Sequence, residues 1–446
     1  MKALARCSFP PPREGKKAFV GGAPTRHFLG RMSREPVCLD PDDPIGVFPG
    51  PSDAEACHAP ERWRETVSAE AVSHLRREGW CVIDGFLSGP RGGGRSGADD
   101  AGPAEAGSLV KDGESRDRDW ASSLRDEIAW LSSVGLLTPN RTHFANHAGE
   151  RYLFSKPHVF EADMHDPDVR RRVPLLKRFF EDTKRFLPDA FARAEEDAER
   201  KHRTRGMATT EGACEESGEA SISENDEASE KVFPFPRVTN LARGDEARVV
   251  KLQHNKGFGG CFPSHYDNPG GASKRLLTCI LYLNCDWQKG DGGELCLTPF
   301  LKRNVKVKPL HDRLCAFYAD RVLHRVEPSF VDRFCLTVWL DGEPGFVNTP
   351  EDVTLRLPKS VLQNPDAVAD HLRVSATQRS LSRAVYREVY ESSLVKCMKD
   401  APGCKEMLAS HEAAVQAVAR NEPLSALVEA LRERKAFAEM GGEEEV

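Results

Sequence analysis

The feature that most constrains the fold is a series of short β-type segments between residues 248 and 340. Apolar and β-branched residues gather there in stretches that Gly, Pro and Asp separate at intervals of about 8–12 residues. The stretches are 249–253, 276–283, 294–297, 305–308, 314–318 and 334–340. Short strands at this spacing are typical of a β-sandwich or a jelly roll. We therefore expect a β core in this part of the chain.

Helical periodicity precedes and follows this region, so the predicted fold class is α+β. Ser68 is expected to cap a short helix that Gly79 ends in the left-handed conformation, before a buried strand at 80–83. Residues 139–172 are expected to mix loop and strand. Apolar residues recur at helical spacing in later segments. These segments are 120–135, 173–186, 361–372, 380–398 and 424–437.

The organisation along the chain follows from these patterns. Residues 1–62 are predicted to be an irregular, basic, Pro-rich tail, residues 63–345 a catalytic domain, and residues 346–446 a helical extension with an acidic end. Residues 88–118 are rich in Gly, Ala and Asp, and residues 195–231 are dense in Glu, Ser and Lys. Because such segments bury little apolar surface, we expect both to be disordered insertions.

Composition argues against nucleic-acid and membrane partners. The net charge of −6 is spread along the chain, so no basic face is expected. No apolar run approaches the ~20 residues of a membrane helix. Residues 1–34 are basic and lack the apolar core of a secretory signal. We interpret them as a disordered tail, with an organelle transit peptide as the alternative.

The 13 cysteines are scattered, and no two of them form a Cys-x-x-Cys pair. A disulfide framework or a structural zinc site would show close paired spacing. We interpret the cysteines as reduced thiols, which favours the cytoplasm or the nucleus as the compartment, or an organelle stroma.

Three residues are candidate metal ligands. His265 and Asp267 are two positions apart, so in an extended strand they point to the same face. His324 follows the predicted strand at 314–318. Two histidines and one carboxylate with open coordination positions form the set that non-haem iron(II) uses to activate oxygen.

An anion site is predicted beside this set. Arg333 opens the strand at 334–340, and its guanidinium could clamp a carboxylate with two parallel hydrogen bonds. Tyr282 and Thr337 could add hydroxyl donors. Taken singly, each of these residues has an ordinary structural explanation, such as core packing or a surface charge. Their order on successive β segments favours a functional site.

A series of short motifs runs through this region: H-Y-D-N-P-G-G, R-L-L-T-C-I-L-Y-L-N, D-W, G-D-G-G-E-L, D-R-L, H-R-V-E-P and R-F-C-L-T-V-W. With the ordered set His265, Asp267, His324 and Arg333, the chain resembles the 2-oxoglutarate- and iron(II)-dependent dioxygenases, and more closely the prolyl 4-hydroxylase branch. Within that branch, the motifs are similar to those of the hypoxia-factor prolyl hydroxylases that act as oxygen sensors. The similarity is strong over residues 248–341 and extends weakly to 71–87 and the helix after Trp120.

The resemblance implies a double-stranded β-helix, the jelly roll of this family, flanked by helices. It implies that His265, Asp267 and His324 bind Fe(II), and that Arg333, with Tyr282 and Thr337, holds 2-oxoglutarate. O2 and L-ascorbate are the other implied small molecules. The implied substrate is a prolyl-containing protein or peptide.

The match has departures. The oxygen-sensing enzymes have a tyrosine ten residues before the first ligand histidine, where this chain has Asn255. Asn255 or Gln253 could substitute as a cosubstrate contact. The zinc-finger module of those enzymes is absent from this sequence, because no paired Cys/His spacing occurs. The region 346–446 has no counterpart in the resemblance.

Other functions stay open. The same chemistry could act on a small molecule or a free amino acid, or a jelly-roll sensor module could bind the metal without turnover. A zinc hydrolase could use the same ligand types, although its His-Glu-x-x-His motif is absent. The C-terminal helices could also bind a partner as a scaffold.

Overall fold

The computed structural model describes residues 45–50, 60–89, 119–145, 151–210, 233–244, 248–349, 364–399 and 401–446. The predictions for residues 1–44, for 90–118 and for 211–231 therefore lie outside the described residues. Within the described ranges, every helix is too short or too polar to span a lipid bilayer.

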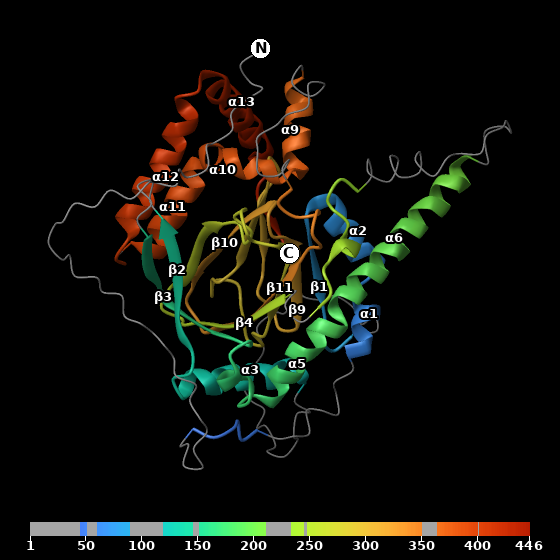
Figure 1. Ribbon diagram of the computed structural model, residues 1–446, viewed down its shortest axis with the longest axis vertical. Coiled ribbons are helices and arrows are strands. Elements are labelled where there is room, and N and C mark those ends of the chain that lie inside the picture. Colours follow the sequence, from blue (N-terminus) through green and yellow to red (C-terminus); the bar gives the residue numbers. More distant parts are fainter. Residues whose placement is uncertain are drawn as a thin grey trace, which may run out of the picture.

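Two β-sheets form the core of the molecule, in the jelly-roll arrangement that the sequence predicted (Figure 1). The larger sheet has the strand order β1-β9-β6-β11-β4-β3-β2, and the smaller has β12-β8-β7-β10-β5. All strand pairs are antiparallel except the short parallel pair of β12 with β8. The strands are β1 (Trp80–Asp84), β2 (Thr138–Ala145), β3 (Arg151–Asp163), β4 (Arg248–Asn255), β5 (Gly260–His265), β6 (Arg275–Tyr282), β7 (Leu295–Pro299), β8 (Val305–Val307), β9 (Arg313–Tyr318), β10 (Val322–Ser329), β11 (Arg333–Asp341) and β12 (Glu444–Glu445).

Alternation along the central strands decides which side chains enter the space between the sheets. On β6, Leu277, Cys279 and Leu281 join the core beneath the helices, whereas Ile280 and Tyr282 join the core between the sheets. This alternation is the period of two expected of a strand that is buried on both faces. Because both faces of β6 are buried, its sequence is a nearly continuous apolar run.

The helices before β4 pack on the outer face of the larger sheet, and they share one apolar core with β1, β4, β6, β9 and β11. In Figure 1, α6 crosses this side of the molecule diagonally. The helices are η3 (Pro60–Arg62), α1 (Trp63–Thr66), α2 (Ala69–Glu78), α3 (Trp120–Ser133), α4 (Pro167–Arg170), α5 (Pro174–Arg185), α6 (Leu187–Thr210) and η4 (Val238–Asn240). Ser68 accepts a hydrogen bond from the Ala71 N–H at 3.2 Å, and Gly79 ends α2 with φ of 89°, so both predicted caps are confirmed.

The C-terminal helices pack against the smaller sheet and gather at one end of the molecule (Figure 1). They are α9 (Pro365–Val374), η5 (Ala376–Gln378), α10 (Arg379–Val385), α11 (Arg387–Met398), α12 (Cys404–Ala419) and α13 (Glu422–Glu439). Strand β5 lies at an edge of the smaller sheet, and the backbone N–H of Ser264 donates to the Ser393 hydroxyl on α11 at 3.0 Å. A helix that covers a sheet edge prevents that edge from pairing with another chain.

The prediction of disorder over 195–231 is wrong for residues 195–210, which belong to α6. The buried carboxylate of Glu195 pairs with Arg76 of α2 and accepts a hydrogen bond from the Thr239 N–H at 2.7 Å. The high charge density of this segment had indicated solvated chain. The carboxylate of Glu195, however, is buried against Arg76, which lies far away in the sequence.

The interpretation of all cysteines as reduced thiols is also wrong, because Cys261 on β5 and Cys397 on α11 form a disulfide. Their Cα atoms are 5.5 Å apart, although 136 positions separate them in the sequence. Only the packing of α11 on β5 brings them together, so no local spacing could have indicated the pair. Seven other described cysteines are free.

Several elements were missed, namely strands β5 and β10 and helix α12. Residues 139–172 were predicted to mix loop and strand, and their described part holds the strands β2 and β3 and the short helix α4. Proline interrupts both missed strands, at Pro263 and Pro328, and proline normally lowers the expectation of a strand. The acidic end pairs with β8 through Glu444 and Glu445.

The Arg76–Glu195 pair predicts a measurable stability difference. Glu195→Ala should lower the free energy of unfolding by about 2–4 kcal/mol, because it removes the direct partner of a buried guanidinium. Glu199 lies 3.6 Å from Arg76 and compensates only in part. Glu196→Ala on the exposed side of the same helix is the matched control and should change stability by less than about 0.5 kcal/mol. Equal denaturant midpoints for the two variants would contradict this account.

Candidate metal centre

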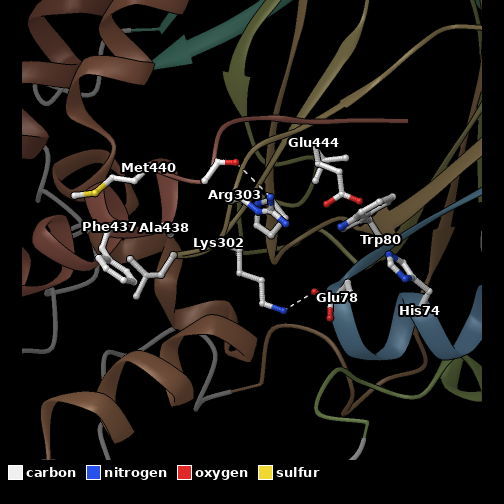
Figure 2. A pocket seen from close by; sticks show the side chains of 13 residues that line it. His74, Glu78, Trp80, Lys302, Arg303, Phe437, Ala438, Met440 and Glu444 are labelled. Carbon is white, nitrogen blue, oxygen red and sulfur yellow. Dashed lines mark hydrogen bonds and ion pairs between the residues drawn. The ribbon is translucent and has the colours of Figure 1, made fainter.

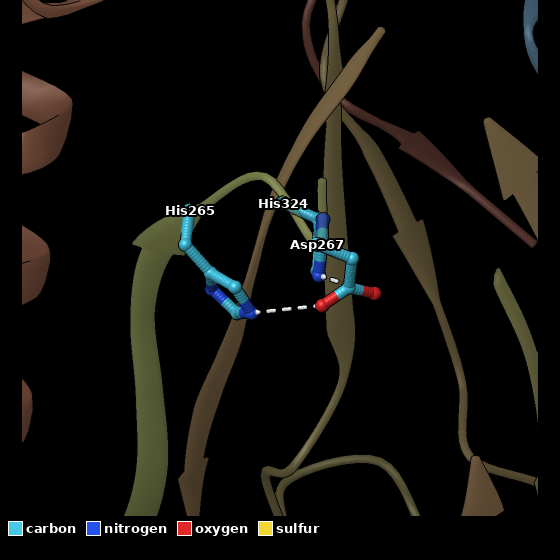
Figure 3. A group of neighbouring side chains, drawn as sticks. All are labelled: His265, Asp267 and His324. Atoms are coloured by element: carbon cyan, nitrogen blue, oxygen red, sulfur yellow. Dashed lines mark ion pairs between the residues drawn. The ribbon is translucent and has the colours of Figure 1, made fainter. Parts of the chain in front are cut away.

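Three side chains able to bind a metal ion meet at one end of the smaller sheet (Figure 3). His265 is the last residue of β5, His324 lies on β10, and Asp267 follows β5 by two positions. The antiparallel register sets His324 directly opposite His265. One donor atom from each of the three residues lies within 4.8 Å of the other two. The structure thus brings together the three candidates that the sequence singled out.

Backbone carbonyl groups orient both imidazoles. Nδ1 of His265 lies 2.7 Å from the Pro263 carbonyl oxygen, and Nδ1 of His324 lies 3.2 Å from that of Val322. A proton on each Nδ1 satisfies these carbonyls and leaves each Nε2 as a lone-pair donor. The two Nε2 atoms lie 3.5 and 3.6 Å from the carboxylate oxygens of Asp267. Hydrogen bonding of the second ring nitrogen is how proteins orient metal-binding histidines.

The protonation states suit a cation. Burial alone would raise the pKa of Asp267, but the neighbouring His324 and His265 lower it, so the carboxylate is ionised. Burial, with the charge of His265, lowers the pKa of His324 to about 4, although Asp267 opposes the shift. His324 is therefore neutral at pH 7, as metal binding requires.

The loop that carries Asp267 is held from both sides. On the inside, the Thr278 hydroxyl of β6 donates to Asp267 Oδ2 at 2.7 Å. On the outside, the Tyr266 hydroxyl bonds with Gln378 at 3.2 Å and Ser382 at 3.1 Å, and both belong to the C-terminal helices. Arg379 of α10 donates to the Asn268 carbonyl oxygen at 2.7 Å. The C-terminal region therefore supports the metal site directly.

The three residues open into a cavity of about 140 Å³ between the sheets. Of the predicted cosubstrate contacts, Arg333, Thr337 and Gln253 line this cavity. The full lining is Asn140, Lys156, Gln253, Phe262, His265, Asp267, Ile280, Leu295, His324, Val326, Arg333, Thr337 and Trp339.

Arg333 is the buried cation of this cavity, with an exposed fraction of 1%. Its Nε donates to the Gly293 carbonyl oxygen at 2.8 Å, and Nη1 to Cys335 Sγ at 3.3 Å. A Cβ at Gly293 would lie 2.8 Å from Arg333 Cδ, so glycine permits this close approach. No carboxylate of the described residues lies within 4.0 Å of the guanidinium. A buried charge without a counter-ion is costly, and a bound anion would remove that cost.

Two predicted contacts, Tyr282 and Asn255, are not among the residues that line the cavity. Both are fully buried, and neither side chain makes a hydrogen bond to the described residues. Arg333 lies over the Tyr282 ring, with Cζ 5.0 Å from the ring centroid, and pairs in register with Asn255. Buried polar atoms without partners are unusual, so we expect water or a ligand to bond with them.

Sequence reasoning missed Lys156, Asn140, Trp339 and Thr278. Strand alternation could have indicated two of them, because Trp339 shares a face with Arg333 and Thr278 shares one with Tyr282. The hairpin of β2 and β3, which provides Asn140 and Lys156, carried no motif. Lys156 Nζ donates to Asn140 Oδ1 at 2.5 Å. Burial lowers the pKa of Lys156 to about 8, which leaves the ammonium as the main species at pH 7.

A larger cavity, of about 690 Å³, lies between α2, β8 and the end of α13 (Figure 2). Lys302 pairs there with Glu78 at 2.5 Å, and Phe437 and Met440 are largely exposed. No residue of the metal centre lines it. Size alone therefore does not indicate the active site here.

Known proteins share this architecture and these motifs. The profile of the 2OG-Fe(II) oxygenase superfamily matches residues 250–341. The chain is similar to a solved structure of prolyl 4-hydroxylases from Phytophthora capsici, with 34% identity and a TM-score of 0.59, over 85% of this chain and 96% of that one.

Curated relatives match a shorter region. Prolyl hydroxylase EGLN3 of Mus musculus is 40% identical over 132 residues, which cover 26% of this chain and 55% of that protein. Egl nine homolog 1 of Homo sapiens is 42% identical over 86 residues, which cover 19% of this chain and 20% of that protein. The chain therefore spans about half the length of EGLN3.

The jelly roll, the two histidines with one carboxylate and the buried arginine define the class of 2-oxoglutarate- and iron(II)-dependent oxygenases. Within this class, the chain belongs to the prolyl hydroxylase branch of the 2OG-Fe(II) oxygenase superfamily.

The hydrogen bond from Thr278 predicts an effect on metal affinity. Thr278→Val keeps the shape but leaves Asp267 Oδ2 without its donor, so the dissociation constant for Fe(II) should rise about 10- to 100-fold. Anaerobic competition against a chelator measures this change. Thr278→Ser, which retains the hydroxyl, is the matched control and should stay close to the unchanged protein. Unaltered affinity in the valine variant would show that the hydroxyl has no role in orienting the carboxylate.

Proposed function

We propose that this chain hydroxylates a peptidyl proline, consumes 2-oxoglutarate and O2, and releases succinate and CO2. The observation that carries the proposal is one small cavity that holds both the His265–Asp267–His324 set and the counter-ion-free guanidinium of Arg333. A site that can bind a cation and a carboxylate together suits an α-keto diacid that bridges the two.

The donor set fits iron(II). One ionised carboxylate and two imidazoles whose Nε2 atoms are free is the ligand combination of non-haem iron oxygenases. We assign His265, Asp267 and His324 as the ligands. When bound, iron(II) with 2-oxoglutarate and O2 supplies the oxidising chemistry that inserts oxygen into a C–H bond.

The residues of the larger sheet fit the cosubstrate. Arg333 would hold the distal carboxylate of 2-oxoglutarate through charge-assisted hydrogen bonds. The Thr337 hydroxyl lies on the same face of β11, and the Tyr282 hydroxyl is a buried donor without a partner. Burial raises the pKa of Tyr282, so this hydroxyl keeps its proton. Gln253 and Asn255 are the candidates for the contact that tyrosine makes in the oxygen-sensing relatives.

The protein walls would control orientation and water. Phe262, Ile280, Leu295 and Val326 provide an apolar lining between the polar groups. An apolar lining strengthens the electrostatic contacts of Arg333 with a bound carboxylate, because little water competes. It also leaves few alternative positions for a dicarboxylate.

The relatives support proline as the target, because those from Phytophthora capsici and mouse are prolyl hydroxylases. A small molecule or free amino acid is the alternative substrate. We also propose L-ascorbate as the reductant that maintains iron(II), and oxygen sensing as the role. For the compartment, the seven free thiols support the cytoplasm or nucleus, whereas the Cys261–Cys397 disulfide weighs against it. The division of the chain at residues 62 and 345 is likewise proposed.

The direct test incubates the full chain with Fe(II), 2-oxoglutarate and O2 and a library of prolyl peptides. Succinate and a peptide mass gain of one oxygen atom are expected together. Succinate without any oxygenated peptide would exclude the peptide substrate, and absence of succinate under all conditions would exclude the oxygenase activity.

Asp267→Ala should abolish both Fe(II) retention and succinate formation, because two imidazoles alone bind the ion weakly. Retention is measured as iron content after gel filtration and succinate by mass spectrometry. Asp286→Ala, on the β6–β7 loop, removes a carboxylate that lies outside the cavity and serves as the control. Iron content equal to that of the control would refute the ligand assignment.

Arg333→Met should raise the KM for 2-oxoglutarate about 10- to 150-fold, which corresponds to the ~1.5–3 kcal/mol of hydrogen bonds to a charged group. Fe(II) affinity should change little, because Arg333 makes no contact with the three ligands. Arg333→Lys keeps the charge without the planar guanidinium, so its KM for 2-oxoglutarate should lie between those of the unchanged protein and the methionine variant. An unchanged KM in the methionine variant would place the carboxylate clamp elsewhere.

A further inference from the structure

A second cavity adjoins the metal centre on the side of the C-terminal helices, with a volume of about 290 Å³. Lys156 on β3 and His265 on β5 form one side of it. Arg383 on α10, Tyr390 and Leu394 on α11 and Met407 on α12 form the other side.

This cavity and the metal cavity share residues. Lys156 and His265 line both of them, so the two spaces meet at the edge of the metal centre. A substrate whose target atom reaches the metal would therefore place a neighbouring residue here. An extended peptide advances about 3.3 Å per residue, so three positions on either side of the target reach about 10 Å from it.

The charged side chains that line the second cavity are cations. Its lining includes Lys156 and Arg383 but neither Asp nor Glu. Arg383 is half-buried, and its Cζ lies 5.3 Å from the centroid of the Tyr390 ring. No carboxylate of the described residues lies within 4.0 Å of either cation.

Neighbouring charged side chains on the same elements already have partners. Arg387 on α11 pairs with Glu412 at 2.7 Å, and Arg432 on α13 pairs with Glu388 at 2.5 Å. Glu161, on the same strand as Lys156, lies 3.5 Å from Lys251 and accepts a hydrogen bond from Asn140. Lys156 itself donates to Asn140 Oδ1 at 2.5 Å and lies near the charges of Glu161 and Asp267. Arg383 makes no ion pair with a carboxylate of the described residues, so it is the cation that can bind a further carboxylate.

We propose that this cavity binds an acidic side chain of the substrate, within about three residues of the target proline. The proposal rests on the proposed function and adds the substrate class, an acidic prolyl peptide. Lys156 and Arg383 bind the carboxylate from opposite walls. Tyr390, Leu394 and Met407 contact the methylene groups of a glutamate or a neighbouring apolar side chain.

The test of the unchanged protein uses pairs of seven-residue peptides with the proline at the centre. The two peptides of a pair differ at one position, which carries Glu in one and Gln in the other, and the six pairs cover the three positions on either side of the proline. Glutamine has the same shape without the charge. At one position or more, the Glu peptide should have a kcat/KM about tenfold higher, as expected for a desolvated charge pair. The difference should lie in KM and should shrink at high salt.

Reversing the charge of Arg383 tests whether this residue binds the acidic side chain of the peptide. Arg383→Glu should remove the preference for Glu over Gln and create one for Lys at the same position. Arg383→Met should remove the preference without reversing it. The control is Arg420→Glu on the exposed end of α12, about 20 Å farther along that helix than Met407. It should retain the wild-type preference.

A binding measurement separates this inference from the proposed function. Fluorescein-labelled Glu and Gln peptides are titrated into the protein without Fe(II), and affinity is followed by anisotropy. Tighter binding of the Glu peptide that Arg383→Glu abolishes supports the subsite, even where no proline is hydroxylated. Equal binding and equal kcat/KM for Glu and Gln peptides at every position would overturn it, while hydroxylation itself would still support the proposed function.

Discussion

The register between β5 and β10 is the constraint on which the site depends. It sets His265 and His324 opposite each other at the end of the smaller sheet, with ring centroids 4.3 Å apart. Asp267 has already left the strand, so the sheet alone does not position it. Thr278 from the larger sheet and Tyr266, anchored on the C-terminal helices, hold the loop instead. The metal site therefore needs both sheets and the extension to be in place.

Strand alternation explains how a charged group can lie inside the jelly roll. Arg333, Cys335 and Thr337 point between the sheets, whereas Phe334 and Leu336 point to the helices and fill their core. The apolar face stabilises the strand, which allows the other face to carry a guanidinium without a counter-ion. The unfavourable burial of that charge becomes favourable once a carboxylate binds, so the site gives up stability in favour of ligand affinity.

Much of this arrangement could be predicted, because two simple periodicities and one ordered set of residues determine it. The positions of β4, β6, β9 and β11 followed from their apolar runs, and the set His265, Asp267, His324 and Arg333 followed from its order along the chain. Strands β5 and β10 were missed because Pro263 and Pro328 interrupt them. The helix at 195–210 and the Cys261–Cys397 pair depend on partners far away in the sequence, which no local pattern contains. Lys156 could not be found for the same reason: only packing brings its strand to the metal.

The C-terminal helices connect the geometry of the metal site with access to it. Through Tyr266 and Arg379 they hold the loop of Asp267, and through Ser393 and Cys397 they cover the strand of His265. The same helices form the outer wall of the neighbouring cavity with Arg383 and Tyr390. Because α10 and α11 contribute to both the support and the wall, a substitution that moves either helix must affect ligand geometry and substrate fit together. Effects on recognition alone are expected from side chains such as Arg383, which lines the cavity and makes no hydrogen bond with the loop of Asp267.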